Sequence, residues 1–197
     1  NAITTYWIFH ATPFGAFVAF LVNASLMATA FWLFHKVKKA TSNRLGYFSF
    51  IVLWIGMEYL HLNWDLSWPW LTLGNVFSTF PLAVQWYEFT GFLGGSFWVI
   101  LINLLLFRVY QKGGKKKVIL LPILVILIPF CISSYMYFNF EDENEQSLNV
   151  LIVQPNINPY IDKFSIGYQS QLTDLINLAK TELTKETELL LAPETAL

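Results

Sequence analysis

Long apolar stretches separated by short polar ones dominate the first 140 residues of this chain. A helix needs about 20 largely apolar residues to cross a bilayer. Four stretches meet or approach that length: residues 14–34, 46–62, 89–107 and 118–138. We therefore predict a transmembrane domain of about four helices over residues 1–140.

Two of these stretches contain residues that interrupt the simple pattern of an apolar helix. Pro122 and Pro129 lie in the fourth, where neighbouring membrane helices can satisfy the carbonyls that they free. The second stretch is short and carries Glu58 and His61, which share a helix face at i and i+3. We expect Glu58 and His61 to form a structural pair, with a proton relay as the alternative, close to Asp65 and Glu88 at the same end. The glycines of residues 91–95 favour close helix packing over phosphate binding, because no strand precedes them.

The pattern changes after the acidic stretch of residues 141–145, which we interpret as a solvated linker. The β-branched run of residues 148–154 predicts a buried strand, and apolar residues at three- and four-residue spacing predict a helix over residues 165–185. Residues 188–193 predict a second strand. This order implies a βαβ unit with parallel strands, which cannot bury both faces of its sheet alone and so implies a larger α/β domain.

Composition supports a membrane protein. The 197 residues are 55% hydrophobic and 13% charged, whereas soluble domains are about one quarter charged. Cys131 is the one cysteine, which excludes a disulfide within the chain and a cysteine-based metal site. It lies in an apolar run, where we expect a buried and inert thiol. The chain begins without Met or a leader pattern, so we expect a fragment or a processed piece.

Basic residues give the membrane domain a predicted orientation. Of the 12 Lys and Arg residues, nine fall in the loops of residues 35–45 and 108–117, which contain no Asp or Glu. Two spans separate these loops, so they share one side of the membrane, and the positive-inside rule places them in the cytoplasm. The loop of residues 61–88 and everything after Asn139 then face the other side.

The last strand leads into the segment LLLAPETAL, which places Glu194 just beyond a run of leucines. Ligands of open α/β folds collect beyond the carboxyl ends of the strands. A carboxylate held there near apolar walls can serve as a general base. The alternative is an ordinary loop acid, solvated or capping the next helix.

Three segments together resemble the opening of a nitrilase-type (carbon–nitrogen hydrolase) domain: NVLIVQPNIN, the residues Asp162–Phe164, and LLLAPETAL. Preceded by several spans and by WPWLTLGN, residues 68–75, they resemble the apolipoprotein N-acyltransferase family. The resemblance implies that residues 147–197 are the N-terminal part of an extracytoplasmic αββα sandwich. Two positions that are often Trp in this family are Phe164 and Ala192 here.

The resemblance also implies an activity. In this family a Glu-Lys-Cys triad moves an acyl chain from a phospholipid, typically phosphatidylethanolamine, through a Cys thioester to the N-terminal amine of the diacylglyceryl-cysteine of an apolipoprotein. Glu194 matches the general base, and Phe164 matches the aromatic residue of the acyl site. We do not assign the Lys and Cys roles to Lys163, Lys180 or Cys131, since none matches, so the chain alone is expected to be inactive.

Further expectations concern partners and location. Trp70, in the WPWL segment, is expected to line the path of the lipid, although Trp is also enriched at membrane interfaces in general. The resemblance implies a bacterial cytoplasmic (inner) membrane location with the nitrilase-like domain outside. It implies no cofactor, no metal and no nucleic acid. Two alternatives remain: another membrane-tethered nitrilase-type amidase or acyltransferase, and a non-catalytic transport or scaffold subunit.

Overall fold

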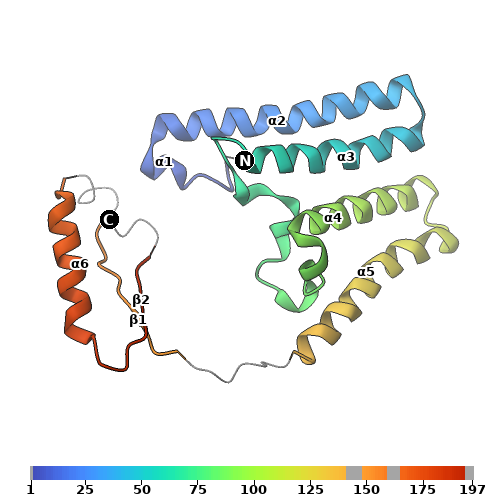
Figure 1. The fold of residues 1–197 in the computed structure, drawn as a ribbon. Helices are drawn as coiled ribbons and strands as arrows, with labels where there is room; N and C mark the ends of the chain where they lie inside the picture. The colour runs from blue at the N-terminus through green and yellow to red at the C-terminus, as the bar shows by residue number, and fades with distance from the viewer. Residues whose placement is uncertain (1, 141–147, 159–164, 194–197) are drawn as a thin grey trace. The chain divides into compact units, whose positions relative to one another are not determined.

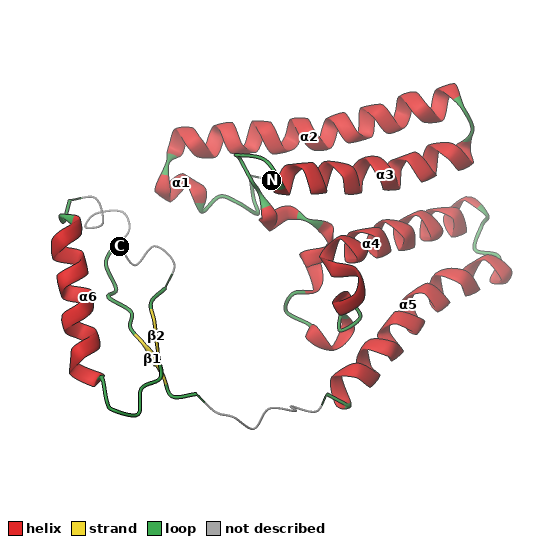
Figure 2. Ribbon diagram, in the orientation of Figure 1, coloured by secondary structure: helices red, strands yellow, loops and turns green. Residues whose placement is uncertain are grey.

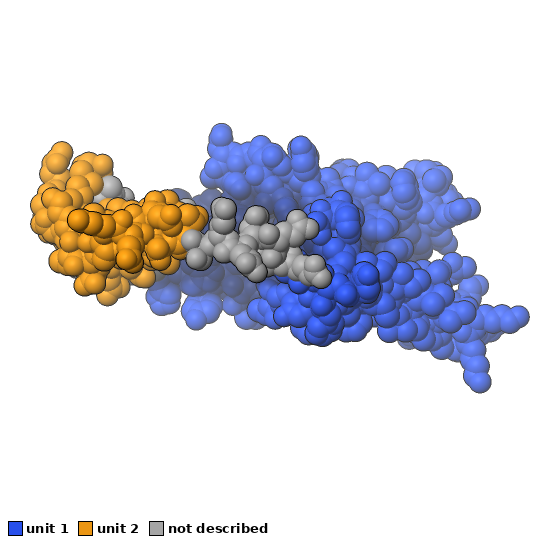
Figure 3. All heavy atoms as spheres, turned by 60° about the horizontal axis from the view of Figure 1, so that its bottom comes forward, with its two compact units in different colours: residues 1–140 blue, residues 141–197 orange. Residues whose placement is uncertain are grey.

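The structure of the chain, a computed structural model, describes residues 2–140, 148–158 and 165–193 (Figure 1). The chain separates into two compact units, residues 1–140 and 141–197 (Figure 3). Each unit is described by itself below.

The first unit is almost entirely helical (Figure 2). Its α-helices are α1 (Ile8–Ala11), α2 (Pro13–Ala40), α3 (Asn43–Leu62), α4 (Tyr87–Gln111) and α5 (Lys116–Phe138). Three short 3₁₀ turns lie between α3 and α4: η1 (Pro69–Leu71), η2 (Leu73–Phe77) and η3 (Pro81–Ala83). The four long α-helices are long and apolar enough to cross a membrane, which confirms that each of the four apolar stretches forms a helix of spanning length.

The helices extend beyond the apolar stretches because capping and polar residues continue the helical backbone into the interface. At the start of α2, Thr12 Oγ1 accepts a hydrogen bond from Gly15 N at 3.2 Å, and Pro13 occupies the first helical position. At its other end α2 runs through its lysines to Ala40. Lys38 Nζ there donates to Tyr47 Oη of α3 at 3.1 Å, so the turn between the two spans is held by a polar contact.

Helix α4 contains a break that the apolar pattern did not predict. Gly91 has φ 62° and ψ −178°, which is not helical. Such a positive φ is readily adopted by glycine. Residues 87–90 therefore form a separate turn, and the regular part of the third span begins after Gly91.

The prolines of α5 behave as expected for a membrane helix. Pro129 has no N–H to bond the carbonyl of Val125, four residues earlier. Trp98 Nε1 of α4 donates to that Val125 oxygen at 2.6 Å, so a neighbouring helix satisfies it. Cys131 also lies on α5, but its side chain is exposed rather than buried as we expected. The expectation was wrong because an apolar run in a spanning helix can face lipid as well as protein.

The second unit contains β1 (Val150–Ile152), α6 (Tyr168–Glu182) and β2 (Leu189–Leu191). The two strands pair in parallel, with Val150 opposite Leu189 and Ile152 opposite Leu191. The predicted strand–helix–strand order and the parallel pairing are confirmed, although each element is shorter than its predicted range. All three leucines of β2 are exposed in the described residues.

Candidate functional site

The tryptophan-rich segment between α3 and α4 is fixed to both helices by buried hydrogen bonds. Leu73 N donates to Glu58 Oε1 of α3 at 2.9 Å. The next residue, Gly74, donates from its N to Ser96 Oγ of α4 at 2.8 Å, and its carbonyl accepts from Tyr87 Oη at 2.9 Å. The WPWLTLGN segment, which contributed to the resemblance, is thus hydrogen-bonded to both α3 and α4.

Two glycines allow this close approach. A Cβ atom built on Gly74 would lie 1.8 Å from the backbone oxygen of Phe92. One built on Gly95 would lie 2.0 Å from Tyr87 Oη and 3.0 Å from Gly74 Cα. A side chain at either position would meet neighbouring atoms, so these glycines allow η2 to pack closely on α4. For Gly95 this agrees with the expected close packing, although its neighbours are η2 and the first turn of α4 rather than another span, and a Cβ atom on Gly91 would meet nothing within 4 Å.

Trp70 is presented at the surface of this segment, with 56% of its surface exposed. Its ring packs edge-on against Trp68, with centroids 5.0 Å apart, and against Trp7, with centroids 5.5 Å apart. Trp7 precedes α1 and lies about 60 residues away in the sequence, so its approach was not predictable from spacing. The role of Trp70 in lining a lipid path stays a prediction.

Glu58 and His61 are buried, with 4% and 8% of their surfaces exposed, but they do not pair with each other. The expected pair was wrong, because better placed partners exist. Glu58 Oε1 accepts from Trp54 Nε1 at 2.9 Å as well as from Leu73 N, and His61 Nε2 bonds Asn23 Oδ1 of α2 at 2.9 Å. Asp65 and Glu88, expected nearby, are both exposed.

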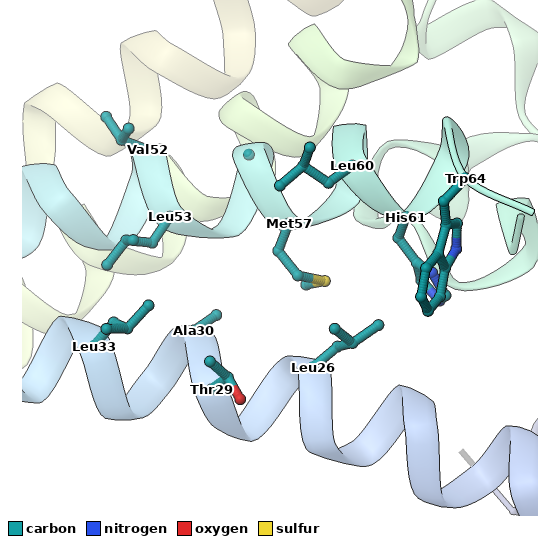
Figure 4. A pocket seen from close by; sticks show the side chains of 11 residues that line it. Leu26, Thr29, Ala30, Leu33, Val52, Leu53, Met57, Leu60, His61 and Trp64 are labelled. Carbon is teal, nitrogen blue, oxygen red and sulfur yellow. The ribbon is translucent and has the colours of Figure 1, made fainter. Parts of the chain in front are cut away.

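An apolar groove of about 340 Å³ runs between α2 and α3 (Figure 4). Aliphatic side chains from the two helices face each other along it, and His61 and Trp64 lie at one end, with ring centroids 5.2 Å apart. The small residues Ala30 and Gly56 contribute to its lining. Sequence reasoning missed this groove, although two small residues on facing spans were the available signal. A groove of this kind can take hydrocarbon.

In the second unit the carboxyl ends of the strands lie side by side. Val153 N, just after β1, donates to Leu191 O at the end of β2 at 2.9 Å. The chain then continues through Ala192 and Pro193 to Glu194. Glu194 and Phe164 lie outside the described residues, so their predicted roles stay predictions. Of the three predicted site residues, Trp70 is the one that lies in the described part of the chain.

One residue between β1 and α6 has an unusual backbone conformation. Asn156 has φ 54°, in the left-handed region, where Asn is among the most tolerant residues after Gly. It belongs to the segment QPNIN that supported the resemblance. Within the described part of the chain, no three His, Cys, Asp or Glu side chains gather as metal ligands would.

Comparison with known proteins gives one consistent result. Residues 1–105 match the family described as Apolipoprotein N-acyltransferase N-terminal domain. A protein named Apolipoprotein N-acyltransferase from Chlorobaculum tepidum is 26% identical over 201 residues, which cover 99% of this chain and 38% of that protein. A protein of the same name from Rickettsia typhi is 28% identical over 99% of this chain and 38% of its own length. Another from Rickettsia prowazekii is 28% identical over 79% of this chain and 30% of its own length. The chain thus spans less than two fifths of the length of these relatives. No solved structure matches it.

Proposed function

The chain belongs to the apolipoprotein N-acyltransferase family, and from this membership we propose that it forms part of an enzyme that acylates lipoproteins at a membrane. The acyl donor would be a membrane phospholipid such as phosphatidylethanolamine. The acceptor would be the N-terminal amine of the diacylglyceryl-cysteine of an apolipoprotein. The observation that carries the proposal is that named relatives align over 99% of the chain, through both the membrane unit and the segment around Pro193.

The proposed reaction has two steps that share a nucleophilic cysteine contributed by the remainder of the protein. The cysteine sulfur attacks the ester carbonyl of the donor, the C–O bond breaks, and the lysophospholipid leaves with a proton. The acceptor amine then attacks the thioester, the C–S bond breaks, and an amide forms while the thiol regains a proton. Cys131 is not this nucleophile, because it lies within the membrane-spanning helix α5.

Glu194 would be the general base in both steps, first for the thiol and then for the amine. Two features support this assignment. In the sequence, Glu194 follows three residues after the end of β2. The parallel pairing of β1 and β2 puts the carboxyl ends of both strands at one edge, which is where open α/β folds collect ligands. Phe164 would contact the acyl chain.

We propose that residues 147–197 are the first part of a nitrilase-like domain. The exposed leucines of β2 support a larger sheet, because a parallel pair is stable when both of its faces are covered. The membrane unit, residues 1–140, would anchor this domain, and its WPWL segment would contact the donor lipid through Trp70.

We further propose that the second unit lies outside the cytoplasm of a bacterial inner membrane. The nine basic residues at the connected ends of α2 and α3 and of α4 and α5 support this orientation by the positive-inside rule. In a full-length background in which Cys131 and every other cysteine are replaced by Ser, an impermeant maleimide applied to intact cells should label Ser147→Cys and leave Lys116→Cys unlabelled until the cells are opened. The reverse pattern would overturn the orientation.

The activity is tested with the full-length protein in detergent micelles, a phospholipid labelled in one acyl chain, and a peptide carrying diacylglyceryl-cysteine. We expect equal amounts of N-acylated peptide and lysophospholipid. In the absence of acceptor, the label should remain on the protein in a form that neutral hydroxylamine releases, as a thioester requires.

The same assay separates the alternatives. An amidase would release ammonia or a free amine from an amide substrate and would leave the peptide amine unmodified. A transport or scaffold subunit would retain no covalent label. Either result would reject the proposed acyl transfer.

A further inference from the structure

Three residues around one small cavity in the membrane unit each have a buried polar atom that finds no hydrogen-bond partner among the described residues. These atoms are Glu58 Oε2, His61 Nδ1 and Trp68 Nε1. All three residues line a cavity of about 10 Å³ between α2, α3 and the tryptophan-rich segment, to which Asn23 and Thr72 also contribute. The side chains of Glu58 and His61 are more than nine-tenths buried. Such groups are rarely left unpaired in folded proteins, because burial removes their bonds to bulk water.

The size of the cavity limits what it can hold. A cavity of about 10–15 Å³ has room for the centre of one water molecule. A lipid headgroup, a hydroxylated side chain of a partner or a hydrated ion is larger than this.

The surrounding bonds determine which atoms donate and which accept. Asn23 Nδ2 donates to Ala19 O at 2.9 Å, so Asn23 turns its Oδ1 toward His61 Nε2, also at 2.9 Å. His61 Nε2 must then carry a hydrogen, and in the neutral ring the other nitrogen, Nδ1, is an acceptor. A Glu58 carboxylate oxygen accepts, and the Trp68 indole N–H only donates. The cavity therefore presents two acceptors and one donor.

We propose that this cavity is a binding site for one water molecule. The water would donate its two hydrogens to Glu58 Oε2 and His61 Nδ1 and accept the Trp68 Nε1 hydrogen, so that every polar atom facing the cavity is paired. It would join α2, through the Asn23–His61 bond, to α3 and to the segment that carries Trp68 and Trp70. This site does not depend on acyl transfer, because its role is to hold the outer end of the membrane unit together.

The test uses the full-length protein in lipid nanodiscs, with two measurements. The first is a cryo-electron microscopy map at a resolution that shows ordered water, in which we expect density bonded to Glu58, His61 and Trp68. Direct contact of Trp68 Nε1 with Glu58 Oε2, with no density between the three residues, would overturn the proposal.

The second measurement compares Trp68→Phe with Trp70→Phe, which removes the same indole N–H from an exposed neighbour. We expect Trp68→Phe to lower the midpoint of thermal unfolding by about 3 °C more than Trp70→Phe, because it leaves the water with one partner fewer. Equal shifts for the two variants would count against the water site. If Trp68→Phe does not fold, the wild-type map decides the question.

Discussion

Both units of this chain expose large apolar side chains, but the two surfaces call for different surroundings. On α5, exposed residues such as Leu120, Ile128 and Ile132 belong to a helix whose backbone groups are bonded within the helix, except opposite its prolines, where Trp98 bonds the Val125 carbonyl, so lipid can cover them. On β2, Leu189, Leu190 and Leu191 belong to a strand whose outer edge carries unpaired backbone groups within the described chain. Lipid cannot bond those groups, so a strand of this kind is completed by protein.

The units also differ in where their polar groups lie. The membrane unit buries Glu58, His61 and Ser96 near the segment between α3 and α4. Glu58 and Ser96 accept hydrogen bonds from the backbone of that segment, and His61 bonds Asn23 of α2. In the second unit the proposed base, Glu194, follows an exposed strand end. This contrast suggests that the first unit supplies position and the second supplies chemistry, and four substitutions test that division.

The largest expected effect is on chemistry and comes from Glu194→Gln. Removing a general base typically costs between a hundredfold and ten-thousandfold in rate, so we expect kcat/KM for acyl transfer by the full-length protein to fall about a thousandfold. Membrane insertion and the thermal unfolding midpoint should not change. Glu186→Gln, which alters an exposed carboxylate in the loop before β2, is the matched control and should keep full activity. Retained turnover in Glu194→Gln would reject the base assignment.

The next effect is on the position of the tryptophan-rich segment. Gly74→Ala would place a methyl group against the Phe92 carbonyl, a backbone atom that cannot rotate away. We expect about 3 kcal/mol of destabilisation, measured by denaturant or thermal unfolding in detergent. Gly56→Ala is the control, since nothing lies within 4 Å of its added methyl group and alanine favours a helix. Equal stability of the two variants would show that η2 does not pack on α4 as described.

A smaller effect is expected where α4 satisfies the carbonyl freed by Pro129. Trp98→Phe removes the donor to Val125 O and should destabilise the protein by about 1–2 kcal/mol. In a Pro129→Ala background, residue 129 can bond Val125 O itself, so the same substitution should cost less. A double-mutant cycle measures this difference, and additive effects would show that the two groups are not coupled.

Part of this fold could be predicted from the sequence alone. The four spans follow from apolar length alone, and the parallel βαβ arrangement follows from the order of two short apolar runs around an amphipathic helix. The helix ends do not follow, because caps such as Thr12 and lysines such as Lys38 extend helices past their apolar cores. The break at Gly91 depends on one backbone angle that apolar periodicity does not encode.

The partners of buried polar residues were the least predictable part. Spacing placed Glu58 and His61 on one face and suggested a pair. Glu58 does bond Trp54 one helical turn away, but its other partner, Leu73, and the partner of His61, Asn23, are 15 and 38 residues away. Contacts at such separations depend on how helices are packed, and local periodicity carries no information about that. The role of Glu194 could be predicted because a carboxylate just beyond a predicted strand lies where open α/β folds bind their ligands.

The smallest expected effect, at Trp70, bears most directly on the division between position and chemistry. Trp70 is exposed and packs edge-on with Trp68 and Trp7, so truncating it should remove lipid contact without opening a core. We expect Trp70→Ala to lower kcat/KM about threefold, through KM, with kcat unchanged, because an aromatic contact contributes about 0.5–1.5 kcal/mol. Trp32→Ala removes an exposed tryptophan from the C-terminal half of α2 and should leave both kcat and KM unchanged. A fall in kcat for Trp70→Ala would mean that the membrane unit acts on the reacting groups as well as on binding, and the division proposed here would fail.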